Sequence, residues 1–236
     1  MGFKARPAPV AVAGARVGFS TFLERAINRK GVEGLAERMP ETTSAQELRD
    51  TADDRALSFM AKGIFCAGFV WRVVENKWPG FEAAFDGFEP IKVASYDSDK
   101  VEELAQDARI VRNRPKIMST IDNARFVVDV ASEYGSFGNW LSMWPADDPV
   151  GLWKQLQSRG SRLGGFTGPL FLRHMGFDTF MLTGDVVKAL VGAGIVSKHP
   201  TSKRDLAAVQ DAFNGWRDES QRPLAHISRV LSCSVD

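Results

Sequence analysis

Hydrophobic and polar positions repeat with a helical period along most of the chain. Between residues 116 and 133, apolar side chains recur every three or four positions, which places them on one face of a helix. Period-two alternation, the pattern of a half-buried strand, is nearly absent. The sequence therefore predicts an all-α protein of roughly ten helices.

Capping residues and prolines suggest where these helices begin and end. Asp53 and Asp54 are suited to cap a long helix over residues 55–75, which is apolar nearly all round and so belongs in the centre of the fold. Pro79 is expected to open a short helix that ends at Phe85. A linker is expected at 41–45 and an extended piece at 178–182, and the other expected helices cover residues 21–28, 98–107, 116–133, 136–143, 149–158, 169–176, 185–191, 206–218 and 223–233.

Composition narrows the class of protein. The 236 residues are 44% hydrophobic and 25% charged, as in an ordinary soluble globular protein. No apolar run reaches the roughly 18 residues that a membrane helix needs, and residues 8–19 are expected to form a flexible arm rather than a signal peptide. Cys66 and Cys233 are expected to be reduced packing residues, which suits a cytoplasmic, nucleoid-associated location. The net charge of +1 does not by itself indicate a nucleic-acid partner.

A glycine-rich connection between two expected helices is the most informative segment. Residues 159–169 carry four glycines together with Arg159 and Arg162, and Pro169 opens the next helix. Glycine lets the backbone approach a ligand closely, and free N–H groups at a helix start bind anions such as a DNA phosphate. A plain tight connection between helices remains the alternative for these residues.

This segment resembles the hairpin of the helix-hairpin-helix DNA glycosylases. The similar residues are Leu163-Gly164-Gly165-Phe166-Thr167-Gly168. The resemblance implies DNA contacts by Arg162, Gly164, Gly165, Thr167 and Gly168, and a catalytic aspartate shortly after the hairpin, for which Asp185 has about the right spacing. The alternative role for Asp185 is that of a helix N-cap. Gly164 and Thr167 depart from the superfamily's usual proline and glycine.

The middle of the chain is similar to the DNA-3-methyladenine glycosylase I family. Several blocks match in order between about residues 54 and 187, among them 67–71, 81–85 and 107–117. Two features of that family are missing. Gly63 stands where the family has a base-recognising glutamate, and the cysteines and histidines of its zinc site are absent, so we expect no metal and no cofactor.

The resemblance implies a two-lobed helix-hairpin-helix glycosylase fold. We expect residues 1–50 to form an N-terminal arm and helical segment and 51–236 the glycosylase domain, with the two ends of the chain able to share one lobe. The partner would be double-stranded DNA that contains a damaged base, without a membrane, and the protein is expected to be a monomer.

Particular residues are expected to carry out the chemistry. Trp71, Phe65 and Phe69 would stack on a base flipped out of the duplex, although core packing is the alternative for Trp71. The Asp185 carboxylate would stabilise the positive charge that builds on the sugar. The basic segment that contains Arg109, Arg112, Arg114 and Lys116 would contact DNA, the alternative being a solvated turn.

These expectations define a monofunctional DNA glycosylase of base excision repair that removes a 3-methyladenine-like alkylated base. No lysine follows the hairpin where bifunctional members of the superfamily carry one, since residues 167–169 are Thr-Gly-Pro. Two alternatives stay open. One is a protein of the same fold that binds damaged or distorted DNA without cutting it, and the other is a helical protein-interaction module.

Overall fold

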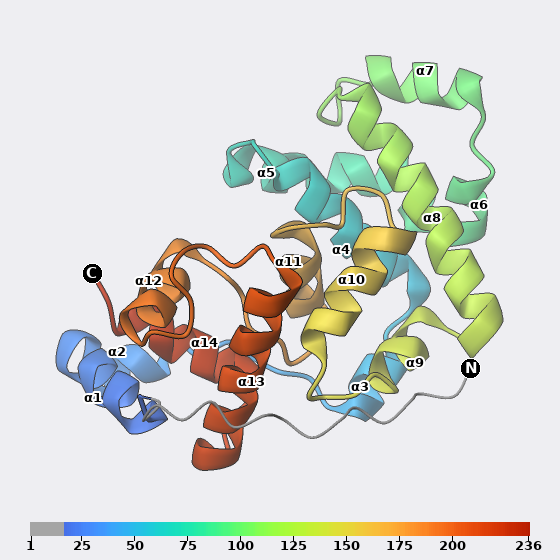
Figure 1. The fold of residues 1–236 in the computed structure, drawn as a ribbon. Helices are drawn as coiled ribbons and strands as arrows, with labels where there is room; N and C mark the ends of the chain where they lie inside the picture. The colour runs from blue at the N-terminus through green and yellow to red at the C-terminus, as the bar shows by residue number, and fades with distance from the viewer. Residues whose placement is uncertain (1–16) are drawn as a thin grey trace.

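The computed structural model describes residues 17–236 and confirms the all-α class. Fourteen α-helices and one short 3-10 helix account for the regular structure of this part of the chain, in which no strand occurs (Figure 1). The helices are α1 (Phe19–Lys30), α2 (Val32–Ala36), α3 (Ala45–Asp50), α4 (Asp53–Cys66), α5 (Trp71–Ala84), η1 (Asp86–Phe88), α6 (Pro90–Ala94), α7 (Ser98–Gln106), α8 (Arg114–Tyr134), α9 (Phe137–Ser142), α10 (Pro149–Arg159), α11 (Thr167–His174), α12 (Gly184–Gly192), α13 (Lys203–Ser220) and α14 (Leu224–Cys233).

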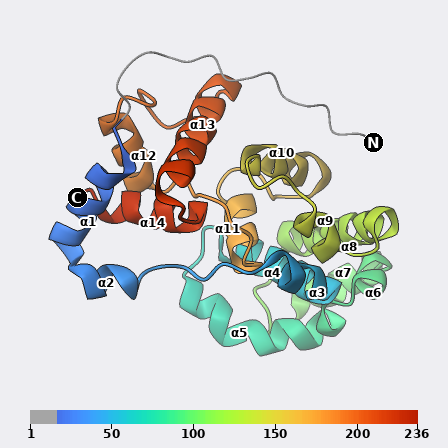
Figure 2. The ribbon, with the colours of Figure 1, turned by 90° about the horizontal axis from the view of Figure 1, so that it is seen from below.

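Two hydrophobic clusters divide these helices into two lobes. The first lobe, α3 to α11, is centred on α4 and α8. The second lobe consists of α1, α2, α12, α13 and α14, so segments from the two ends of the chain share one core. Figure 2 shows α1 beside α14 in this lobe. Trp153 on α10 packs against both clusters, which places α10 where the lobes meet.

The long helix expected over residues 55–75 is two helices. Helix α4 ends at Cys66, Gly68 follows with a positive φ of 74°, and α5 begins at Trp71. The Lys116 ammonium donates to the carbonyl oxygens of Phe65 and Ala67, at 3.1 and 2.7 Å, and so supplies partners to the end of α4. The pattern of hydrophobic positions in the sequence does not indicate this break, because the residues on both sides of it are apolar.

Other helix boundaries also differ from the sequence expectations. Pro79 lies inside α5 and does not open a new helix, and Ala52 rather than Asp53 or Asp54 is the N-cap residue of α4. The short helices α2, α3 and α6 were not expected. Helix α3 directly follows the predicted linker and has a full capping box between Ser44 and Glu47. The arm expected at residues 8–19 lies mostly outside the described residues.

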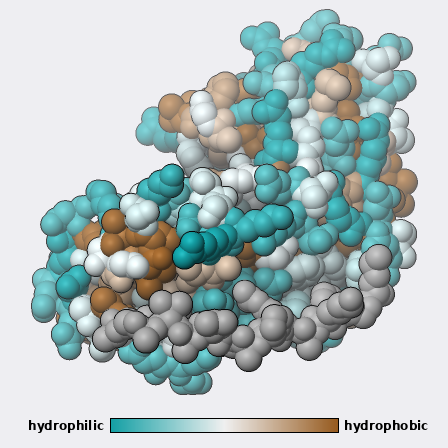
Figure 3. Space-filling view, in the orientation of Figure 1, coloured by the Kyte–Doolittle hydropathy of each residue, from teal (hydrophilic) through white to brown (hydrophobic). Residues whose placement is uncertain are grey.

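The surface is hollowed between the lobes. Helices α5 and α12 lie on opposite sides of this notch, and Figure 3 shows it in the outline of the molecule. In the described part of the chain, no helix is both long and apolar enough to cross a membrane.

Candidate nucleic-acid interface and base pocket

The hairpin between α10 and α11 is anchored to the first lobe on one side and exposed to solvent on the other. Leu163 is buried in the first core, and the side chain of Asn123 on α8 makes two hydrogen bonds, of 2.7 and 3.0 Å, with the backbone of Ser161. Above these anchors, Arg162 and Gly165 are exposed, and both have a φ of +59°. The structure therefore presents a fixed loop with a free arginine and a glycine that has open space around it, as a phosphate contact requires.

The glycines of the hairpin have different roles. A Cβ on Gly165 would meet no atom within 4 Å, so the positive φ alone requires glycine there. Gly168, in contrast, is buried, and a Cβ there would lie 2.4 Å from the carbonyl oxygen of Leu163. Close packing within the protein therefore accounts for the glycine at this position, and the expected DNA contact of Gly168 stays a prediction. Helix α11 also begins at Thr167, two residues before Pro169.

An aromatic pocket lies directly beside the hairpin. It has a volume of about 250 Å³, and none of the described side chains that line it is charged. Trp71, Phe69 and Phe166 are each between 41% and 49% exposed, and the Lys116 ammonium lies 4.9 Å from the centroid of the Phe69 ring. The lining is Gly63, Cys66, Ala67, Gly68, Phe69, Trp71, Phe166, Thr167 and Leu170. The structure thus brings two of the predicted base-binding residues next to the predicted DNA-binding hairpin, with Phe166 and Thr167 contributing to both.

Phe65 does not line this pocket. Its side chain is 0% exposed and packs edge to face on Phe81, with ring centroids 4.6 Å apart. This corrects the expectation that Phe65 stacks on a base. The error follows from the helix break, because Phe65 lies on the inward face of α4 while Phe69 and Trp71 come after its end.

Gly63 is one of the residues that line the pocket. A Cβ at this position would lie 3.6 Å from the Thr167 methyl group, which is an ordinary van der Waals contact, so the position has room for a small side chain. Among the described residues of the lining, Thr167 has the only side-chain hydroxyl, and most of the lining surface is aromatic or aliphatic.

His174 lies close to the pocket, and the sequence did not indicate it as a candidate site residue. It lies seven residues after Thr167 and therefore on the same face of α11, and its ring centroid is 6.2 Å from that of Trp71. Its Nδ1 is buried and has no hydrogen-bond partner. Burial, together with the charges of Lys62 and Arg173, lowers the pKa of His174, so the ring is neutral at neutral pH.

The basic segment after α7 is largely paired within the protein. The Arg109 guanidinium is 2.7 Å from the Asp107 carboxylate, and Arg114 pairs with Glu102. Lys116 is only 7% exposed and is held on the end of α4, which corrects the expectation that it faces DNA. Arg112 is exposed and makes no ion pair with another described residue. Of the four basic residues in this segment, Arg112 is the one most available to contact a DNA phosphate.

Asp185 lies in the first turn of α12, but it does not cap the helix. The N-cap residue is Thr183, whose hydroxyl accepts a hydrogen bond of 3.3 Å from the N–H of Val186. The Asp185 carboxylate is about half exposed and forms an ion pair of 3.8 Å with Lys188. The capping role given as the alternative for Asp185 is thus filled by another residue, and the catalytic role of Asp185 stays a prediction.

The side chains that could bind a metal ion do not cluster in the described part of the chain. Among residues 17–236, no three His, Cys, Asp or Glu side chains come together in a way that would hold a metal ion. Cys66 and Cys233 are buried free thiols and belong to different lobes. That the protein binds no zinc stays a prediction.

Comparisons with solved structures define the class of fold. A crystal structure of 3-methyladenine DNA glycosylase I in complex with 3-methyladenine superposes with a TM-score of 0.50 at 21% identity, covering 60% of this chain and 83% of that one. The 8-oxoguanine glycosylase/lyase of Methanocaldococcus jannaschii, solved with DNA that contains 8-oxoguanine, also gives 0.50, at 12% identity, and covers 90% of this chain and 94% of the other. The chain has the all-α fold of the helix-hairpin-helix DNA glycosylases.

Within this class, the resemblance to methyladenine glycosylases is confirmed over part of the sequence. Residues 48–160 match the methyladenine glycosylase family. DNA-3-methyladenine glycosylase 1 of Escherichia coli (strain K12) is 46% identical over 59 residues, which is 25% of this chain and 32% of that protein. The chain thus aligns with about a third of the length of this curated relative.

Proposed function

We propose that this protein is a monofunctional DNA glycosylase that flips an alkylated, 3-methyladenine-like base out of duplex DNA and hydrolyses its N-glycosidic bond. The observation that carries this proposal is the junction of the hairpin with the aromatic pocket. Phe166 and Thr167 belong to both, so a strand whose phosphate rests on the hairpin passes the mouth of the pocket. The match to methyladenine glycosylases supports the same reaction.

The phosphate contact would come from the hairpin backbone and Arg162. Both Gly165 and Arg162 are exposed, and Asn123 holds the loop backbone at Ser161 through two hydrogen bonds. Contacts of this kind position DNA without reading its sequence. Arg112 would add a further phosphate contact from the first lobe.

The flipped base would stack on Trp71, with Phe69 and Phe166 closing the pocket. An N-alkylated purine in DNA carries a positive charge, and an indole face attracts a cation by about 0.5–2 kcal/mol. Because no lining side chain is charged, this attraction takes the place of a carboxylate at position 63. The pocket would therefore hold alkylated purines through their ring and charge together.

Asp185 would supply the electrostatic part of catalysis. As the glycosidic bond breaks, positive charge builds on the sugar, and a nearby ionised carboxylate stabilises that charge. The leaving base of an N-alkylated nucleotide departs as a neutral molecule, so no strong general acid is needed. Residues 167–169 include no lysine that could form a Schiff base with the sugar. The product would therefore be an intact strand with an abasic site.

The test is to incubate the protein with methylated duplex DNA and to identify the released bases by mass spectrometry. We expect free 3-methyladenine from the wild type and little from Trp71→Ala or Asp185→Asn at equal protein concentration. Tight, salt-dependent binding of the methylated duplex without any released base would refute the enzyme and leave a damage-binding protein of the same fold. Failure to bind DNA at all would refute both.

A further inference from the structure

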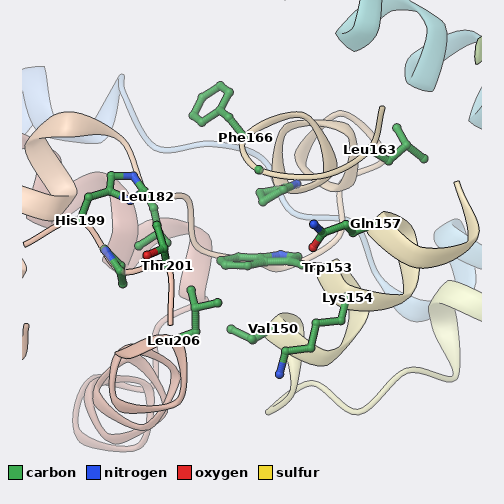
Figure 4. A pocket seen from close by; sticks show the side chains of 13 residues that line it. Val150, Trp153, Lys154, Gln157, Leu163, Phe166, Leu182, His199, Thr201 and Leu206 are labelled. Carbon is green, nitrogen blue, oxygen red and sulfur yellow. The ribbon is translucent and has the colours of Figure 1, made fainter. Parts of the chain in front are cut away.

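A second cavity lies next to the hairpin, apart from the base pocket. Its volume is about 370 Å³, within the range of roughly 300–1,000 Å³ typical of small-molecule sites. It is built where the lobes meet, from α10, the hairpin, the 199–201 segment and the start of α13. Figure 4 shows Trp153 in the middle, with the side chains of α10 on one side and those of the 199–206 segment on the other. Phe166 is the one residue shared with the base pocket.

The cavity offers a rigid aromatic floor. The indole nitrogen of Trp153 donates to the Thr179 hydroxyl at 3.1 Å, and its ring packs edge to face on Phe180 at 4.7 Å. These two contacts fix the orientation of the indole. Apolar side chains, among them Leu182 and Leu206, form the walls beside it. A flat, uncharged ring system is the chemical group that fits such a surface.

The charge of the rim points to an anion. Among the described residues, no Asp or Glu lines the cavity, whereas Lys154 does, together with the imidazole of His199, the amide of Gln157 and the hydroxyl of Thr201. Lys154 is exposed and makes no ion pair with another described residue, so its charge is available to a ligand. Lysine commonly binds phosphate as a point charge.

We propose that this cavity binds a nucleotide, with the base against Trp153 and the phosphate at Lys154. The site is separate from the base pocket and goes beyond the proposed glycosylase reaction, since it neither needs nor supplies a catalytic step. Two kinds of ligand would present a base and a phosphate to this cavity. One is a free nucleotide, and the other is an unpaired nucleotide in a DNA strand that the hairpin holds. The hairpin forms one wall of the cavity through Leu163, Gly165 and Phe166, so a strand bound there passes close to its mouth.

The binding test uses the full-length protein and isothermal titration calorimetry with dAMP, deoxyadenosine and inorganic phosphate. Thr201→Trp places a large side chain at an exposed lining position, and Lys154→Glu reverses the rim charge. Lys30→Glu is the matched control, because Lys30 is an exposed lysine of α1 that does not line the cavity. Trp71→Ala removes the main ring of the other pocket. Thermal melts of every variant show whether it is folded.

We expect dAMP to bind more tightly than either deoxyadenosine or phosphate. Lys154→Glu should weaken dAMP at least tenfold while changing deoxyadenosine little, and Thr201→Trp should abolish both. Lys30→Glu should leave dAMP binding unchanged, and Trp71→Ala should retain a dAMP site that Lys154→Glu still weakens. No detectable binding of dAMP at millimolar concentration would overturn the proposal. So would loss of binding in Trp71→Ala with retention in a folded Thr201→Trp, because the nucleotide would then occupy the base pocket.

Competition separates the two sources of nucleotide. A duplex with one unpaired adenine that displaces dAMP, where a fully paired duplex does not, identifies DNA as the source. If neither duplex displaces dAMP, the ligand is a free nucleotide. Both results support the site. The glycosylase proposal is judged by base release alone, so its failure would leave dAMP binding, and thus this proposal, unaffected.

Discussion

Substitutions at the hairpin glycines should distinguish effects on the stability of the protein from effects on its affinity for DNA. Gly165→Ala places a Cβ on a backbone with φ +59°, which costs about 1–2 kcal/mol, of which about 0.4–1 kcal/mol is offset by the stiffer unfolded chain. Gly168→Ala puts the new carbon 2.4 Å from the Leu163 carbonyl oxygen, so the backbone must move, at a cost of about 1–3 kcal/mol or more. Gly164→Ala meets only the flexible Gln157 side chain, at 3.2 Å, and should be nearly neutral.

Thermal melts and fluorescence anisotropy with a labelled duplex measure the two effects. For a chain of this length, 1 kcal/mol shifts Tm by about 2–4 °C, so Gly164→Ala, Gly165→Ala and Gly168→Ala should melt in descending order. Gly165→Val should weaken binding of all duplexes about tenfold or more, the value of one lost charge-assisted hydrogen bond. Arg162→Ala should lower the salt slope by about one. A folded Gly165→Val that binds DNA like the wild type would refute the phosphate-binding role of the hairpin.

Three further predictions concern the pocket, its neighbour His174 and the proposed catalytic carboxylate. Asp185→Asn should slow single-turnover base release by roughly 10²–10³ without lowering Tm, because Thr183 caps the helix; equal rates would exclude the assignment. Gly63→Glu should tighten binding of duplex that contains an N-methylated purine more than binding of undamaged duplex, since it puts a carboxylate beside Thr167; equal changes by anisotropy would contradict this. Burial and neighbouring cations lower the pKa of His174, so the unfolded chain takes up its proton first and stability falls as the pH drops below about 6.5. Melts of His174→Gln between pH 5 and 7.5 should show a smaller fall than the wild type, and parallel curves would refute the argument.

Helices with strong local signals were predictable from the sequence. The expected helix over residues 185–191 lies within α12, and the long helix α8 follows its apolar period closely. The break between α4 and α5 was not predictable by periodicity, because the residues before and after it are equally apolar. It depends on Gly68 and on a lysine that lies 49 residues away from Ala67 in the sequence.

The candidate site was predictable to the extent that it is local in sequence. The hairpin and Trp71 are recognisable from neighbouring residues, and the structure places them together. Phe65 and Lys116 were assigned to ligands because sequence shows residue type but not direction, and both side chains point into the protein. His174 and the cavity beside Trp153 arise from tertiary packing, for which the sequence has no short motif.

The glycine at position 63 bears on how such an enzyme would choose its substrate. A carboxylate in the pocket would favour a cationic base already in the bound ground state, whereas the cation–π attraction of Trp71 is worth about 0.5–2 kcal/mol, or roughly 2- to 30-fold. Stacking on Trp71 and Phe166 is available to any flat base. Discrimination against normal bases would then come mainly from the bond-breaking step, because a cationic alkylated base leaves readily and a neutral one does not. We therefore expect alkylated and unmodified purines to differ by no more than about 30-fold in binding and by much more in the rate of release. A large difference in affinity with similar single-turnover rates would show that the pocket reads the base by a contact other than these rings.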